Sequence, residues 1–220
     1  MAENIVKLLT HYWFNFLEGT GYTLLMSLIA VFFGLIIGAL LALLRRARFK
    51  ALRFIATAYI EVIRGTPVLL QLYFFYFLLP DLIPIGLSKF QCVMFALIVN
   101  SSAYTAEIIR SGIQAVDSGQ MEAARSLGLN SRHSMIWVVL PQAVKNILPA
   151  LCNEFITVIK ETSLASTFFI GELMTQFREL SGALYLAIEP LIIIGVIYFA
   201  LTFTLSKGVA VIERRLALSD

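Results

Sequence analysis

Polar residues recur at helical spacing within two stretches of the chain that are otherwise apolar. The first stretch contains Asn100, Tyr104 and Glu107, with Ser101 and Ser102 beside them. The second repeats the intervals of four and three residues with Asn153, Thr157 and Lys160. Residues at these intervals share one face of a helix, and ionisable residues in apolar helices usually face a cavity or a partner. Two such faces on consecutive helices can line a water-filled route between subunits.

A structural role is the alternative for several of these residues. Glu107 and Arg110 can form an ion pair near the lipid headgroups, and this is favoured for both. Lys160 and Glu161 can mark the outer end of a helix. A neighbouring polar face is formed by Glu154, Thr157 and Glu161. The route is the favoured role for Asn100, Asn153, Glu154 and Lys160.

The composition indicates that these polar groups lie in a membrane. Of the 220 residues, 59% are hydrophobic and 14% are charged, whereas soluble proteins carry about 25% charged residues. Residues 19–44 contain no charge, and about 20 apolar residues suffice to cross a bilayer. A cleaved signal peptide is the alternative for this segment, but the apolar run is too long and no basic cluster precedes it.

Five apolar segments predict an all-α integral membrane protein with five transmembrane helices. The segments are residues 19–44, 54–79, 89–112, 135–161 and 184–208. A short helix is expected around Leu173, between the last two. No repeat or linker divides the chain, which indicates a single domain over residues 1–220.

Prolines and glycines predict two irregular points near the second segment. Arg64-Gly65-Thr66-Pro67 predicts a distorted helix, because proline removes a backbone hydrogen bond and glycine adds freedom. This distortion can serve packing or gating, and packing is favoured. Pro80, Pro84 and Gly86 predict a short outer turn.

Basic residues predict the orientation of the chain. One loop after the first segment contains Arg45, Arg46, Arg48, Lys50 and Arg53. Arg214 and Arg215 follow the last segment. Because positive residues next to membrane spans remain in the cytoplasm, we expect the N-terminus outside and the C-terminus in the cytoplasm. The loop of about residues 114–134 then lies in the cytoplasm as well.

The loop of residues 114–134 contains the signals of a short, capped helix. Asp117 and its polar neighbours precede Glu122 and two alanines, Ala123 and Ala124, as at a helix start. Gly128 then permits the positive φ that often ends a helix. Such a narrow helix suits a groove on a partner, although an ordinary amphipathic connector between spans is the alternative.

The spacing of residues within this loop favours a helix that binds a partner over an ordinary connector. Gly128 follows Glu122-Ala123-Ala124 after three residues, Val138 follows after nine more, and Leu140-Pro141 follow after one more. This spacing resembles the signature loop of permease subunits of binding-protein-dependent ABC importers. Valine at 138 is the one departure, since isoleucine is common there. Five stretches of the chain resemble the polar amino acid branch of that family: EVIRGTPVLLQLYF, AYTAEIIRSGIQAV, GQMEAARSLGL, VVLPQA and KETSLAS. The resemblance covers about residues 20–213.

The resemblance implies the type I ABC importer permease fold, in which this loop is a coupling helix seated in a cleft of a cytoplasmic ATP-binding subunit. The residues that it assigns to coupling are Gly119, Glu122, Ala123, Ala124, Arg125 and Gly128. The substrate pathway is assigned to Asn100, Ser102, Tyr104, Glu107, Asn153, Glu154, Thr157, Lys160 and Glu161. Lys160 and Glu154 can match the carboxylate and the ammonium of an amino acid.

The expected function is that of the membrane permease of an ATP-driven, binding-protein-dependent importer of polar amino acids. A permease for methionine, phosphate or another small solute is the alternative, and a membrane scaffold or signalling anchor is less favoured. The chain lacks a GxxxxGK[ST] loop, so we expect it not to be an enzyme and expect ATP and Mg²⁺ to be bound by a separate subunit.

Further partners are expected on the same basis. They are a second permease subunit in a homodimer or heterodimer, an external solute-binding protein and the lipid of a bacterial inner membrane, with no nucleic acid. Asp81, Lys89, Arg178 and Glu179 are available to the solute-binding protein. Cys92 and Cys152, with two distant histidines, predict neither a disulfide nor a metal site.

Overall fold

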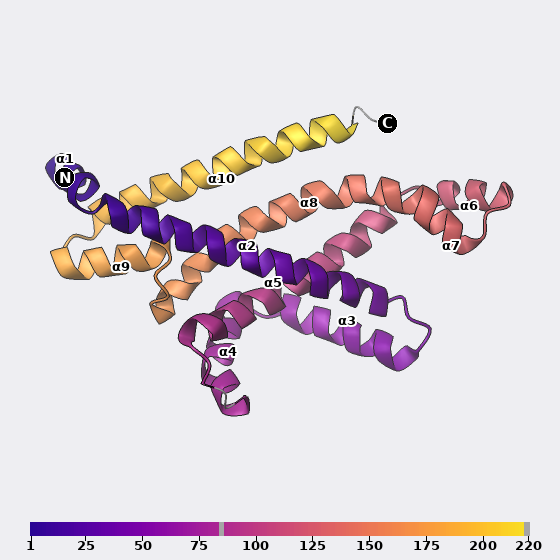
Figure 1. The fold of residues 1–220 in the computed structure, drawn as a ribbon, viewed down its shortest axis with the longest axis horizontal. Coiled ribbons are helices and arrows are strands. Elements are labelled where there is room, and N and C mark those ends of the chain that lie inside the picture. Colours follow the sequence, from indigo (N-terminus) through magenta and orange to yellow (C-terminus); the bar gives the residue numbers. More distant parts are fainter. Residues whose placement is uncertain (84–85, 218–220) are drawn as a thin grey trace.

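In the computed structural model, which describes residues 1–83 and 86–217, the chain consists of helices and their connections, without a strand (Figure 1). In chain order the elements are α1 (Ala2–His11), α2 (Trp13–Leu44), α3 (Lys50–Arg64), α4 (Val68–Leu82), α5 (Lys89–Gln114), α6 (Ser118–Ser126), α7 (Ser131–Ser134), the π-helical η1 (Met135–Val139), α8 (Leu140–Glu161), the 3₁₀ segment η2 (Thr162–Phe168), α9 (Leu173–Leu184) and α10 (Ile188–Ala217).

The predicted all-α membrane fold is confirmed. Within the described residues, four helices are long and apolar enough to cross a membrane, namely α2, α5, the continuous helical run Ser131–Phe168 and α10. The pair α3 and α4 meets the same criterion as one bent crossing. The first span begins at Trp13, earlier than predicted, and α9 supplies the short helix expected around Leu173.

The predicted second span, residues 54–79, is not one continuous helix. α3 ends at Arg64 and α4 begins at Val68, and the directions of the two helices differ by 109°. Pro67 has no N–H to donate, and its ring disfavours the helical conformation of the residue before it. The predicted distortion is therefore a complete break in the helix.

The connection between α4 and α5, predicted as an outer turn, begins later than predicted. Pro80 lies inside α4, which continues to Leu82, and Pro84 lies outside the described residues. Ser88 caps α5: its Oγ accepts a hydrogen bond from the Gln91 N–H (3.2 Å), and the Gln91 Oε1 accepts one from the Ser88 N–H (2.8 Å). This reciprocal capping box fixes the start of α5.

α5 is the central helix, with α2, α3, α4 and α8 packed around it. The closest approach is made by α2, through a stripe of small residues at intervals of four: Ala30, Gly34, Gly38 and Ala42, all buried. A Cβ at Gly34 would lie 2.7 Å from Ser101 Oγ, and one at Gly38 would lie 2.8 Å from the Ser102 carbonyl oxygen. Small residues of this kind let two membrane helices pack backbone against backbone.

The two ends of the bundle are occupied by different short helices. α6 and α7 lie at one end, and α1 and α9 lie at the opposite end (Figure 1). At the α1 and α9 end, Leu8, Phe16, Leu173, Leu180 and Ile194 form an apolar cluster that joins α1, α2, α9 and α10. α6 is therefore well separated from this cluster.

We predict that Gly38→Ala destabilises the protein by about 1–3 kcal/mol, because the added methyl group overlaps α5 at a close-packed contact. Gly21→Ala is the matched control. Gly21 lies in the same helix, and a Cβ there meets nothing within 4 Å, so the change should stabilise by up to about 1 kcal/mol through helix propensity. Thermal unfolding of the purified protein in detergent measures both effects, and equal shifts would contradict the close contact.

Candidate functional site

α6 is a short helix with a specific cap at each end. The Asp117 Oδ1 accepts a hydrogen bond from the Gly119 N–H (2.6 Å) at its start. At its end, Gly128 has a φ of 93°, and its N–H donates to the Arg125 carbonyl (3.0 Å) while the Leu129 N–H donates to the Ala124 carbonyl (3.2 Å). These two bonds form a Schellman motif, which satisfies carbonyls that the helix end leaves free.

Five of the six residues assigned to coupling lie on the surface of α6 and its turn. Gly119, Glu122, Ala123, Arg125 and Gly128 are exposed. Ala124 is only 4% exposed and packs α6 onto the chain itself, so within this chain it does not share the exposed surface of the other five. Leu127, at 86% exposed, was not predicted, although an apolar residue within this polar loop is a usable signal.

α6 is joined by one tight turn to a long, continuous helical run. The Asn130 Oδ1 accepts a hydrogen bond from the His133 N–H (2.9 Å) and so caps α7. α7 continues through the π-helical η1 into α8. Pro141, at the start of α8, cannot donate a hydrogen bond, and a local widening of the helix accommodates the missing donor. The connection is therefore rigid on both sides of Gly128.

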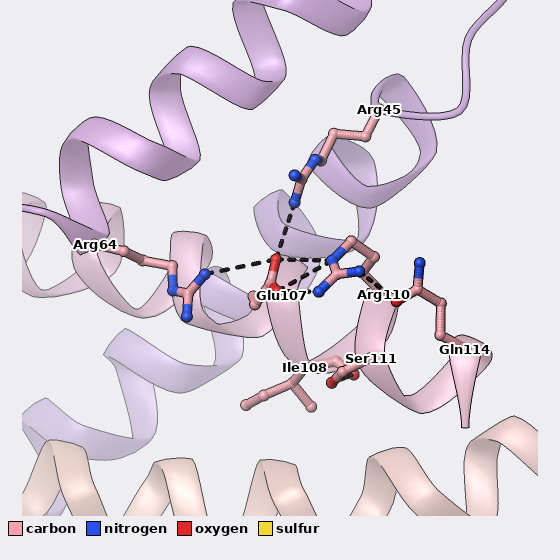
Figure 2. A network of polar contacts seen from close by, with 7 residues as sticks. All are labelled: Arg45, Arg64, Glu107, Ile108, Arg110, Ser111 and Gln114. Carbon is pink, nitrogen blue, oxygen red and sulfur yellow. Dashed lines mark hydrogen bonds and ion pairs between the residues drawn. The ribbon is translucent and has the colours of Figure 1, made fainter.

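Near the end of the bundle that carries α6, Glu107 binds three arginines from three helical segments (Figure 2). Its Oε2 lies 2.9 Å from Arg45 Nη1, at the end of α2, and 3.6 Å from Arg64 Nη1, in α3. Arg110, one turn further along α5, donates from Nε to both carboxylate oxygens at 3.0 Å. The Arg64 guanidinium also lies over the Tyr104 ring, 5.6 Å from its centroid.

This network bears on the role of Glu107. The predicted ion pair with Arg110 is confirmed, and Arg45 and Arg64 extend it to α2 and α3. Because three guanidinium groups occupy its carboxylate, the contacts favour the structural role of Glu107 over its predicted place in the substrate pathway. Tyr104 belongs to the same network through Arg64.

Asn100 and Ser102 are buried in contacts within the chain. The Asn100 Nδ2 donates to the Gln71 Oε1 (3.0 Å), and the Ser102 Oγ lies 2.8 Å from the Tyr59 hydroxyl. Among the described residues, the buried Asn100 Oδ1 has no hydrogen-bond partner. The first polar face therefore points mainly into the fold and not onto an open surface.

Gln71 is a buried polar residue that was not predicted to matter at this site. Its Nε2 donates to the carbonyls of Ile63 (2.7 Å) and Thr66 (3.1 Å), which the break between α3 and α4 leaves without helical partners. Within a membrane such groups must be satisfied inside the protein. Gln71 thus closes the break and connects it to Asn100 in α5. A single amide in the apolar stretch from Val68 to Leu79 was the available signal.

The polar residues of α8 divide into two groups. Asn153 and Lys160 are exposed, with the half-buried Thr157 between them. Glu154 is only 8% exposed and lies beside Ser101 of α5 and the half-buried Glu161. Within one chain, therefore, the exposed face of α8 and the polar face of α5 do not line a common route, and Glu154 is the acidic group that lies between the two helices.

A second buried carboxylate, Glu172, lies at the end of the bundle opposite α6 and was also not predicted. It caps α9 by accepting from the Thr175 N–H (2.8 Å), and Tyr198 of α10 donates its hydroxyl to it (3.3 Å). Burial raises the pKa of the Glu172 carboxyl, and the surrounding donors lower it in part. The Leu173 N–H donates to Thr23 of α2 (3.1 Å), so this group of residues fastens α2, α9 and α10 together.

The described residues contain no group of three or more histidine, cysteine, aspartate or glutamate side chains that could hold a metal ion. Cys92 is buried and Cys152 half-buried, and both are free thiols.

Comparison with known proteins identifies a family. Residues 30–218 match the family described as binding-protein-dependent transport system inner membrane component. The arginine transport system permease protein ArtQ of Bacillus subtilis is 41% identical over 204 residues, covering 93% of both chains. The putative glutamine transport system permease protein GlnP of Rickettsia bellii is 41% identical over 219 residues, covering 100% of both chains.

Solved structures agree with this match. A crystal structure of an amino acid ABC transporter with histidines superposes with a TM-score of 0.90 at 44% identity, covering 94% of this chain and 96% of that one. An inward-facing form of the MetNI methionine ABC transporter superposes with a TM-score of 0.75 at 20% identity, covering 92% and 96%. The second likeness shows a shared fold alone.

We predict that Gln71→Leu destabilises the protein by about 2–3 kcal/mol, because it leaves buried carbonyls at the helix break and the Asn100 amide unsatisfied. Gln120→Leu is the control, since Gln120 is exposed and its side chain bonds only to Gln142 at 3.2 Å; it should cost less than about 0.5 kcal/mol. Thermal unfolding in detergent distinguishes them. A Gln71 variant as stable as the control would show that the break does not depend on this amide.

Proposed function

The chain belongs to the family of binding-protein-dependent transport system inner membrane components, and we propose that its cargo is a polar amino acid. The cargo is supported by the arginine and glutamine transport permeases that resemble the chain over nearly its full length. A methionine or phosphate permease remains the alternative, but the 20% identity to the methionine transporter supports the fold and not that cargo.

The observation that carries the mechanism is the exposed, doubly capped helix α6. It presents Glu122 and Ala123 to solvent beside the exposed Leu127, a combination of small, charged and apolar groups that suits a protein groove. We assign this surface to a separate, cytoplasmic ATP-binding subunit, which holds ATP and Mg²⁺. The chain itself has no phosphate-binding loop of the GxxxxGK[ST] type, so hydrolysis belongs to that subunit.

The mechanical path from α6 into the membrane runs through Gly128. The Schellman turn fixes α6 against the cap of α7, and the helical run Ser131–Phe168 then crosses the bilayer. A displacement of α6 is transmitted along this run as the movement of a rigid element. It reaches Asn153, Glu154 and Lys160 without passing a flexible loop.

The orientation follows from the basic residues. The connection from α2 to α3 contains Arg46 and Arg48, and α10 ends near Arg214 and Arg215. Since such residues favour the cytoplasmic side, we place these segments and α6 in the cytoplasm and the N-terminus outside, in the inner membrane of a bacterium. The opposite end exposes Asp81, Lys89, Arg178 and Glu179 to a solute-binding protein.

The substrate route requires a second permease subunit. Among residues 1–83 and 86–217, no element covers the exposed face of α8 at Asn153 and Lys160, and a two-fold partner would place a related face opposite it. Lys160, on this exposed face, can then bind the carboxylate of an amino acid, and Glu154, on the buried side of α8 beside α5, is the acidic group nearby that can bind its ammonium group. Both a homodimer and a heterodimer satisfy this geometry.

To test the coupling surface, we propose Gly128→Asp in the importer reconstituted with its ATP-binding subunit and solute-binding protein in vesicles. A non-glycine residue at a φ of 93° is strained, so α6 should lose its fixed position. Uptake of radiolabelled arginine and glutamine should fall about 10- to 100-fold, the size of a typical coupling free energy, while ATP hydrolysis continues.

Ser131→Asp is the control for this variant. It adds the same charge to the same exposed loop at the start of α7, where an acidic residue is tolerated, and uptake should remain close to that of the unmodified protein. The unmodified chain should also co-purify with an ATP-binding subunit. Normal uptake by Gly128→Asp, or a chain that never co-purifies with such a subunit, would overturn the proposed function.

Removal of the charge at position 154 tests the substrate route. Glu154→Gln keeps the size of the side chain and one acceptor oxygen but loses the negative charge that would bind an ammonium group, so uptake should fall about tenfold while the affinity of the isolated solute-binding protein is unchanged. Glu213→Gln, at an exposed position in α10, is the charge-matched control. Equal uptake by the two variants would remove Glu154 from the route.

A further inference from the structure

A cavity of about 310 Å³ lies between the ends of α2 and α5, beside the Glu107 network. Its lining consists of Ala42, Arg45, Arg46, Arg110, Ile113 and Gln114. Two other cavities among the described residues are lined mainly by apolar side chains, whereas this one brings together three guanidinium groups. No acidic side chain is among its lining residues.

The charges around the cavity are unequal. Glu107 is the single carboxylate in contact with Arg45, Arg64 and Arg110, so this network alone carries an excess of two positive charges. Arg46 adds a third, and within the described residues it forms no ion pair with an acidic side chain. Arginine has five N–H donors. Figure 2 shows that Arg45 contacts Glu107 through one nitrogen, whereas Arg110 donates to Glu107 from Nε and Nη2 and to Gln114 Oε1 from Nη1. Most of the unused donor capacity around the cavity therefore belongs to Arg45 and Arg46.

We propose that this cavity binds a phosphate-bearing anion. Guanidinium groups match the geometry of phosphate oxygens and bind them with charge-assisted hydrogen bonds, and Gln114 adds an amide donor. A bound anion would balance the excess positive charge and hold the ends of α2 and α5 together. The cavity has room for a phosphate group, since a single water molecule occupies about 30 Å³ of liquid.

The position of the cavity favours the headgroup of an acidic phospholipid as the source of the phosphate. The apolar helix α2 ends at Leu44, immediately before Arg45 and Arg46, which is the depth at which headgroups meet a membrane helix. Leu40 and Leu43 are 56% and 67% exposed on the last turns of α2, and they offer an apolar surface to the acyl chains. Basic pockets of this kind at the cytoplasmic side select acidic lipids.

The test compares two arginines of the same loop in the purified importer complex. Arg46→Gln removes a lining residue that takes no part in the Glu107 network, whereas Arg48→Gln removes an exposed charge outside the cavity. Native mass spectrometry with added phosphatidylglycerol or phosphatidylcholine measures lipid binding. Arg46→Gln should weaken phosphatidylglycerol binding about fivefold, corresponding to about 1 kcal/mol per basic residue, and Arg48→Gln less than about twofold.

Free phosphate is distinguished in a second arm, by calorimetric titration of the complex in phosphatidylcholine nanodiscs with inorganic phosphate. Binding that Arg46→Gln weakens and Arg48→Gln does not would support the anion site with free phosphate as its ligand. Equal losses in both variants, or no preference for phosphatidylglycerol over phosphatidylcholine together with no phosphate binding, would overturn the proposal. Thermal unfolding of each variant confirms that it remains folded.

Discussion

The close approach of α2 to α5 depends on glycine at positions 34 and 38. Lipid tails are as apolar as the side chains, so burying an apolar side chain between two membrane helices contributes little free energy. Such helices therefore associate through close backbone packing and van der Waals contact. A Cβ at either position would overlap Ser101, Ser102 or Thr105. This contact places the end of α2 beside α5, and only then can Arg45 reach Glu107. The electrostatic network thus depends on a packing contact several turns away.

A break in a membrane helix is tolerated where side chains form hydrogen bonds with the backbone groups that the break leaves free. At the break between α3 and α4, Gln71 donates to the freed carbonyls and accepts from Asn100. A break without this amide would expose polar groups to lipid, at a cost of several kcal/mol per group. The break and the central helix are therefore joined by the same side chain, which makes α3, α4 and α5 one structural unit.

Features determined by local sequence were predictable, whereas those determined by tertiary packing were not. The charge-free run of residues 19–44 predicted the first span, apolar length predicted the others, and Asp117 and Gly128 predicted both ends of α6. The burial of Ala124 was not predictable, because Ala123 and Ala124 are identical in type and only the position of η1 distinguishes them. Glu107 could be paired with Arg110 by helical spacing, but Arg45 and Arg64 lie 62 and 43 positions away along the chain.

The contact between α5 and α8 limits how movement of α6 can reach the substrate route. Near the start of α8, a Cβ at Gly112 would overlap the Ile147 side chain, so the two helices cannot approach further there and can only pivot or slide. Glu154 lies two turns beyond Ile147 on the buried side of α8. In the proposed mechanism, a pivot at Gly112 would change the separation between Glu154 and Ser101 and so would connect a force applied at α6 to the polar contact between α5 and α8.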